Sequence, residues 1–138
     1  MTNFLIFVGQ EWMLVSALLA LAGLFMWSEN QRAGEAVSVH QLTAQVNNAN
    51  ALVVDLREPK EFREGHIVDA LNIPFTKLAE RANELELHKQ RPLVLVDKLG
   101  QHTAPAGRTL KQAGFQVVRL TGGMSEWSAS NLPVVKGG

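Results

Sequence analysis

Four polar side chains that could take part in acid–base chemistry lie close together in the sequence: Asp55, Arg57, Glu58 and His66. Carboxylate and imidazole groups are the usual general acids and bases of enzymes. A structural role explains the group better, because Asp55 ends an aliphatic run and its carboxylate can cap the following turn or pair with a neighbour. We likewise expect His66 to be a hydrogen-bonded structural residue rather than a base.

A second candidate is the segment DKLGQHT, which follows the aliphatic run at 93–96. Its members are Asp97, Lys98, Leu99, Gly100, Gln101, His102 and Thr103. A glycine-containing turn that leads into a helix presents several backbone N–H groups, and the helix dipole adds positive potential there. The segment is therefore a candidate anion cradle. Asp97 could also be a nucleophile or a base, but aspartyl nucleophiles normally have a metal or a second acid nearby. A loop and helix-capping role is favoured.

Composition excludes several classes of function. The chain has no cysteine, which excludes disulfides, thiolate metal sites and thiol nucleophiles. Its 13 basic and 13 acidic residues balance, so charge gives no reason to expect a nucleic-acid partner. The four histidines, at positions 40, 66, 88 and 102, lack paired metal-ligand spacing. We expect no metal and no cofactor.

Apolar runs alternate with helical patterns over the last hundred residues. Continuous aliphatic runs predict buried strands at 52–54, 93–96 and 117–120, with weaker candidates at 36–39 and 71–73. Helical periodicity lies between them, at 78–85 and 106–113, and a last short helix contains Trp127. This alternation predicts an α/β domain with a central parallel sheet flanked by helices.

The first quarter of the chain is strongly apolar. Between Trp12 and Trp27 the only polar side chain is that of Ser16. Sixteen helical residues span about 24 Å, and adding residues 4–8 brings the length up to a hydrocarbon core of about 30 Å. We predict a single transmembrane helix at 4–27, a linker at 28–35 and a domain at 36–138. A cleaved signal peptide and a buried core helix are disfavoured, since residues 1–11 have no Lys or Arg and the helix is apolar on all sides.

The basic residues after this helix set the expected orientation. The flank before the helix has no Lys or Arg, whereas Arg32 and further basic residues follow it. The positive-inside rule then favours a cytoplasmic domain at the membrane.

Four blocks of the sequence resemble the rhodanese-like domain family, over about residues 36–135. They are residues 53–58 with Glu61 and Phe62, residues 65–74, the run 93–96 with the DKLGQHT loop, and residues 120–124 with Trp127. Together, their order and spacing are fairly specific. One transmembrane helix before one such domain also resembles a membrane-bound subgroup of that family.

The resemblance implies a catalytic cysteine at the start of the loop after the fourth strand, which carries sulfur as a persulfide beneath the loop's N–H groups. With the loop aligned on Gly100 and Thr103, that position falls on Asp97, and His102 replaces the usual arginine. Aspartate cannot form a persulfide, and backbone N–H donors would hold its carboxylate ionised inside the cradle. We therefore expect no thiosulfate sulfurtransferase activity and no cysteine-dependent phosphatase activity.

The resemblance also implies roles for residues outside the loop. Asp55, Arg57, Glu58 and His66 correspond to a polar brace behind it. Asp69 stands where the family pattern usually has glycine, and aspartate tolerates a left-handed backbone better than most residues.

Two classes of function follow. The favoured one is a membrane-tethered, catalytically inactive rhodanese-like module with a protein-binding or regulatory role and a protein partner that the sequence does not identify. The alternative is a sulfurtransferase-related enzyme whose thiol comes from another protein, or an anion-sensing domain that acts through the loop Asp97–Thr103. An Asp97→Cys variant separates them, because gain of persulfide formation would show that only the nucleophile had been lost.

Overall fold

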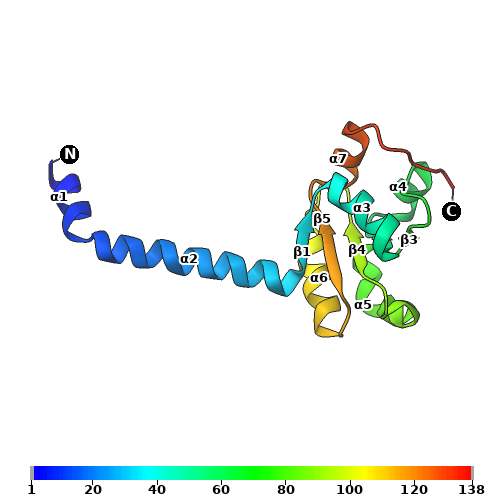
Figure 1. Ribbon diagram of the computed structural model, residues 1–138, viewed down its shortest axis with the longest axis horizontal. Helices are drawn as coiled ribbons and strands as arrows, with labels where there is room; N and C mark the ends of the chain where they lie inside the picture. Colours follow the sequence, from blue (N-terminus) through cyan, green and yellow to red (C-terminus); the bar gives the residue numbers. More distant parts are fainter. Residues whose placement is uncertain (1, 138) are drawn as a thin grey trace. The chain divides into compact units, whose positions relative to one another are not determined.

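The computed structural model describes residues 2–137, without the side chains at positions 2, 8, 30 and 45–49. The chain divides into two compact units, one up to Gln31 and one from Arg32 onward. Figure 1 gives the order of the elements along the chain. Gly138, the last residue of the domain expected at 36–138, lies outside the described residues.

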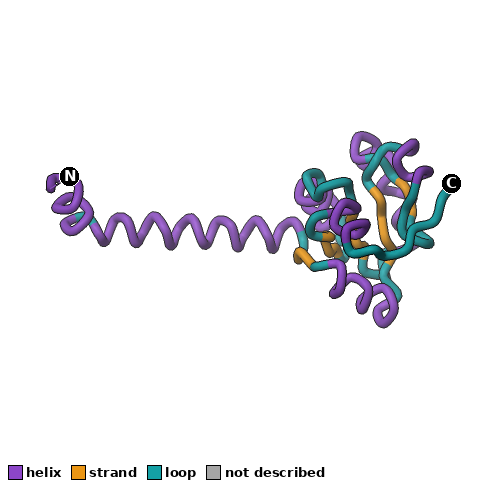
Figure 2. Tube along the Cα trace, turned by 90° about the horizontal axis from the view of Figure 1, so that it is seen from above, coloured by secondary structure: helices purple, strands orange, loops and turns teal. Residues whose placement is uncertain are grey.

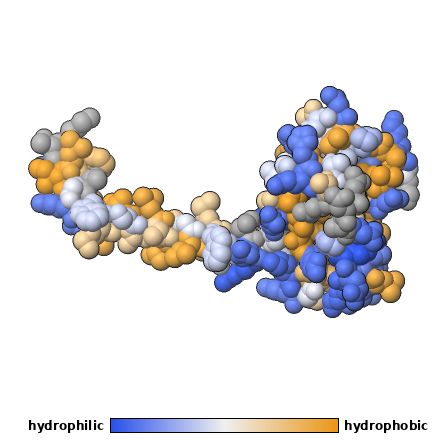
Figure 3. All heavy atoms as spheres, viewed as in Figure 1, coloured by the Kyte–Doolittle hydropathy of each residue, from blue (hydrophilic) through white to orange (hydrophobic). Residues whose placement is uncertain are grey.

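The first unit is helical. It contains α1 (Thr2–Gln10) and most of α2 (Trp12–Ala33), with a bend at Glu11 between them. The apolar segment predicted as one helix at 4–27 is therefore two helices. Within the described chain, α2 is the one helix long and apolar enough to cross a membrane. Its 22 residues rise about 33 Å, slightly more than a hydrocarbon core. Apolar side chains cover much of its visible surface (Figure 3).

The segment expected as a linker, residues 28–35, is mostly helical. Helix α2 continues through Ala33, and the first strand starts at Glu35. The polar residues here include good helix formers such as Glu29, Gln31 and Arg32. Gly34, with φ of +97°, provides the left-handed backbone that ends the helix.

The second unit is built on a parallel sheet whose strand order is β1-β5-β4-β2-β3. The strands are β1 (Glu35–Val37), β2 (Leu52–Asp55), β3 (Leu71–Asn72), β4 (Leu93–Val96) and β5 (Val117–Leu120). The three aliphatic runs form the central strands as predicted, and the two weaker candidates are the short edge strands.

Helices connect the strands along the chain and cover both faces of this sheet (Figure 2). They are α3 (Val39–Ala49), α4 (Pro59–Glu64), η1 (Phe75–Lys77), α5 (Leu78–Arg81), η2 (Ala82–His88), α6 (Thr103–Gln112) and α7 (Gly123–Ala129). The helix expected across 78–85 starts as α5 but tightens into the 3-10 helix η2. The spacing of three residues from Ala82 to Leu85 fits that tighter helix.

Alternate side chains of the central strands fill two hydrophobic cores. Leu93 and Leu95 belong to the core shared with α5, η2 and α6. Val94 and Val96 belong to the core shared with α3 and α7. All four are fully buried, as expected for a parallel strand covered on both faces. This packing fixes the carboxyl ends of β2 and β4 side by side.

Candidate functional site

The loop after β4 is placed where the fold favours a ligand site. Asp97 follows Val96 at the carboxyl end of the strand, and α6 begins six residues later at Thr103. In parallel α/β sheets, ligands bind at this edge, beyond the carboxyl ends of the strands. The structure thus places the predicted loop between a central strand and a helix N-terminus.

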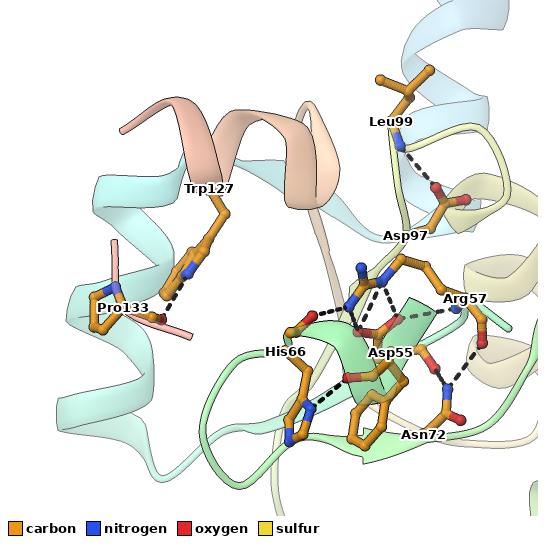
Figure 4. A network of polar contacts seen from close by, with 10 residues as sticks. Asp55, Arg57, His66, Asn72, Asp97, Leu99, Trp127 and Pro133 are labelled. Carbon is orange, nitrogen blue, oxygen red and sulfur yellow. Dashed lines mark hydrogen bonds and ion pairs between the residues drawn. The ribbon is translucent and has the colours of Figure 1, made fainter. Parts of the chain in front are cut away.

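The carboxylate of Asp97 fills the interior of its own loop. It is 2% exposed. One oxygen accepts hydrogen bonds from the backbone N–H groups of Leu99, at 3.0 Å, and Gly100, at 3.1 Å. The other oxygen accepts one from the N–H of His102, at 2.7 Å. Figure 4 shows Asp97 turned toward Leu99. The donors that could hold an external anion are therefore bound to a side chain of the protein.

The rest of the loop is shaped by local contacts. Gly100 has φ of +93°, a left-handed conformation that favours glycine. The hydroxyl of Thr103 donates to the carbonyl of Gly100 at 2.9 Å. Gln101 also accepts from the Leu99 N–H, at 3.1 Å. The imidazole of His102 stacks on the Phe75 ring, with ring centres 4.5 Å apart. These contacts leave Leu99 at the tip of the loop, 62% exposed.

A second segment, the start of α7, supports the loop from outside. The N–H of Met124 donates to the Asp97 carbonyl at 2.8 Å, and the N–H of Ser125 donates to the Lys98 carbonyl at 3.0 Å. Gly123, with φ of +59°, makes this approach possible, because a Cβ there would collide with the carbonyl of Asp97. Sequence reasoning placed residues 120–124 in a family block but missed this role, since the partners are far apart in the chain.

Asp55 and Arg57 form a buried ion pair at the neighbouring strand end. Asp55 is 1% exposed, and its carboxylate lies 2.7 Å from an Arg57 guanidinium nitrogen. The Arg57 Nε and backbone N–H also donate to this carboxylate. The same guanidinium donates to the Gly65 carbonyl at 2.7 Å (Figure 4). Arg57 thus connects the end of β2 to the segment after α4.

Asn72 and His66 complete this network on two sides. The Asn72 amide donates to the backbone carbonyls of Asp55, at 3.0 Å, and Arg57, at 2.9 Å. His66 is buried, its Nδ1 lies 2.7 Å from the Phe62 carbonyl, and its ring stacks on the Phe62 ring. Asn72 was not singled out from the sequence, although it lies in the second family block.

Glu58 differs from the other three members of the predicted brace. Its side chain is exposed and makes no capping hydrogen bond to α4. It instead borders a pocket of about 350 Å³. Asp69 has φ of 64°, so this position does take the left-handed backbone that the family's glycine provides.

The pocket that Glu58 borders is lined by residues of both candidate groups, the loop Asp97–Thr103 and the predicted polar brace. Leu56 and Phe75 give it an apolar part, while Arg57, Asp97 and His102 line it with polar groups. His66 is not among its lining residues. Within the described part of the chain, no three His, Cys, Asp or Glu side chains are grouped so that they could hold a metal ion. The same part holds no buried side-chain nitrogen or oxygen without a hydrogen-bond partner. The buried polar side chains around the loop therefore have hydrogen-bond partners within the domain, most of them backbone groups.

Comparison with known proteins assigns this architecture to a family. The family model of the rhodanese-like domain matches residues 38–130. The chain therefore belongs to the rhodanese-like domain family. The match includes the loop from Asp97 to Thr103, the Asp55–Arg57 pair and the start of α7.

Individual relatives agree with this assignment. The uncharacterized protein YibN of Escherichia coli strain K12 is 39% identical over 99 residues, covering 70% of this chain and 69% of YibN. A protein of Allochromatium vinosum named sulfurtransferase is 34% identical over 87 residues, covering 62% of this chain and 79% of that protein. The crystal structure of a rhodanese-related protein from Thermoplasma volcanium superposes with a TM-score of 0.68 at 30% identity, covering 73% and 97% of the two chains.

Proposed function

We propose that this protein is a membrane-tethered rhodanese-like module that binds another protein and does not itself transfer sulfur. The observation that carries the proposal is the occupied cradle. The carboxylate of Asp97 accepts hydrogen bonds from the backbone N–H groups of Leu99, Gly100 and His102. Without this carboxylate, the three N–H groups would be free to bind an external anion. In this view, Asp97 stands at the position of the family's cysteine and holds the loop in a fixed shape.

The chemistry of the chain supports the absence of sulfur transfer. A persulfide needs a sulfur atom in the loop, and the chain has no cysteine. The competing candidate, a sulfurtransferase, is favoured by family membership and by the name of the Allochromatium vinosum relative. Fold alone does not carry an activity without its site. That candidate would need a partner protein to supply the thiol.

The proposed tether is α2. A module held at a membrane meets other membrane proteins at a raised effective concentration, so a weak contact is enough for association. The length and apolar composition of Trp12–Ala33 support this role. The basic residues that follow support a cytoplasmic position for the domain.

The proposed recognition surface is the outer side of the loop. Leu99 is 62% exposed at its tip. Its neighbours Lys98 and Gln101 border the 350 Å³ pocket whose apolar part contains Phe75, whereas Leu99 itself borders a separate pocket of about 270 Å³. An exposed aliphatic side chain at the tip of a loop can serve as an anchor that enters a pocket of a partner protein. A loop locked by Asp97 would present Leu99 in one conformation and so reduce the entropy cost of binding.

Crosslinking of the tagged full-length chain in native membranes tests this proposal. A Leu99→Asp variant should lose the partner that the unaltered chain captures. A Leu87→Asp variant is the matched control, because Leu87 is 89% exposed on η2 and should not affect capture. A version with a foreign transmembrane helix should retain the partner. Loss of capture only with the foreign helix would contradict recognition by the domain, as would equal capture by the Leu99 and Leu87 variants.

A further inference from the structure

A second pocket, away from the Asp97 loop, is lined by basic side chains. It has a volume of about 320 Å³ and is bordered by Arg32, Arg108, Lys111 and Gln112. Arg32 comes from the last turn of α2, and the other three come from α6. None of these residues belongs to the candidate site described above.

The packing of α6 explains why these side chains converge. Gly107, Arg108 and Lys111 lie on one face of α6, because residues three and four apart are neighbours on a helix. A Cβ on Gly107 would collide with the carbonyl of Ala33, so the backbone after Arg32 lies directly against this face. The glycine thus brings Arg32 beside Arg108 and Lys111.

A fourth cation adds to the positive potential here. Burial and the nearby positive charge of Arg108 lower the pKa of Arg119 below its ordinary value. The acidic residues closest to Arg32 in the sequence are Glu29 and Glu35. Three basic side chains therefore line the pocket, and a fourth lies near Arg108.

Chain connectivity places this pocket close to the end of the apolar segment. Arg32 follows Trp27 by five residues. Even a fully extended chain of that length reaches no more than about 18 Å, and five helical residues rise about 7.5 Å. Phospholipid headgroups occupy the outer 5–8 Å or so of a bilayer on each side. If α2 spans the membrane, the pocket lies within reach of these headgroups.

We propose that the pocket of Arg32, Arg108 and Lys111 binds the phosphate of an anionic phospholipid headgroup in the leaflet next to the domain. The proposal rests on the membrane tether of the proposed function. Guanidinium groups bind phosphate oxygens in a bidentate manner, and a lysine adds a point charge. The amide of Gln112 is a neutral donor for headgroup hydroxyls. Basic side chains next to a membrane are attracted to anionic lipid in the same way.

Reconstitution of the full-length chain in lipid nanodiscs tests the proposal. One set of discs contains phosphatidylcholine alone, and the other contains phosphatidylcholine with phosphatidylglycerol. Native mass spectrometry then measures which lipid stays bound to the protein. The unaltered chain should retain phosphatidylglycerol preferentially. The double variant Arg108→Gln, Lys111→Gln should lose about 30-fold in that preference, since each cation near a membrane surface contributes about fivefold.

The matched control is Lys77→Gln, Lys89→Gln, which removes two exposed cations outside the pocket and should keep the preference. Equal retention of both lipids by the unaltered chain would overturn the proposal, as would an unchanged preference in the pocket variant. Displacement of the lipid by inorganic phosphate at equal concentration would show a general phosphate site instead. Failure of the chain to enter discs of either composition would refute the tether itself, whereas a preference failure would refute only the pocket.

Discussion

The carboxylate of Asp97 occupies the position, between the backbone N–H groups of its loop, where an external anion could otherwise bind. Three backbone N–H groups converge on its two oxygens, and the residue is 2% exposed. Hydrogen bonds to a charged acceptor contribute about 1.5–3 kcal/mol each, and unsatisfied buried donors carry a similar cost. The loop conformation and the charge at this position are therefore coupled. Removing the carboxylate should both weaken the domain and open an anion site.

The Asp97→Ala variant should respond to sulfate. Without the carboxylate, the freed N–H donors at the start of α6 can bind an anion. Sulfate at about ten times its dissociation constant would stabilise the folded state by about 1.4 kcal/mol. Thermal unfolding of the full chain in mild detergent should then shift upward by several °C for a domain of this size. The unaltered protein and an Asp69→Asn control should show no sulfate-dependent shift, and an equal response from all three would contradict the occupied cradle.

We expect the ion pair of Asp55 and Arg57 to contribute to the stability of the folded domain. The Arg57→Leu variant leaves a carboxylate that is 1% exposed without its cation. Breaking a buried pair by removing one partner typically costs about 3–5 kcal/mol. Urea unfolding should therefore show a large loss of stability. The matched control is Arg81→Leu, which removes the exposed ion pair with Glu84 and should leave the unfolding midpoint unchanged. Similar midpoints for both variants would argue against a bracing role for Arg57.

At the scale of elements, the loop depends on two neighbours that the sequence pattern did not reveal. The aliphatic runs located β2, β4 and β5 correctly, and the rule for carboxyl ends of strands located the loop. The hydrogen bonds from Met124 and Ser125 join α7 to the loop across more than twenty residues. No local periodicity encodes such a contact. The helical state of residues 28–33 was missed because polar side chains and a following glycine suit both a linker and a helix end.

The contact of α6 with the end of α2 provides a prediction for Gly107. An added Cβ would collide with the Ala33 carbonyl. Overpacking of this kind typically costs about 1–3 kcal/mol. The Gly107→Ala variant should lose stability in urea unfolding although alanine has the higher helix propensity. A Thr109→Ala control changes an exposed position on the same helix and should not lose comparable stability. A gain of stability in Gly107→Ala would show that α6 does not pack against residue 33.

At the scale of the whole molecule, we propose that the chain consists of an anchor and a recognition domain. The apolar helix α2 would hold the domain at a membrane, the basic pocket would contact lipid, and the loop of Asp97 would present Leu99 to a protein. Arg32 belongs both to α2 and to the basic pocket, but Leu18, Leu99, Arg108 and Lys111 each belong to one surface only, so substitutions at these positions alter one surface at a time. Membership in the rhodanese-like domain family accounts for the fold, and the proposed loss of sulfur chemistry accounts for the aspartate.

The anchor itself can be tested by alkaline carbonate extraction of membranes. The unaltered chain should remain in the membrane fraction. Leu18→Arg together with Leu21→Arg places two charges near the middle of the apolar run, at a cost of about 6 kcal/mol for insertion. This variant should move to the supernatant, whereas a Leu87→Arg control on the domain should not. Extraction of the unaltered chain by carbonate would contradict the tether.

We propose above that Asp97 takes the place of a sulfur-carrying residue. The most direct measurement is the formation of thiocyanate and sulfite from cyanide and thiosulfate by the purified full chain in mild detergent, beside Asp97→Cys and Asp97→Ala. We expect the unaltered chain and Asp97→Ala to give only the rate that is measured without protein. Turnover by Asp97→Cys would show that the cradle geometry still accepts a sulfur anion. Turnover by the unaltered chain that disappears in Asp97→Ala would contradict the account.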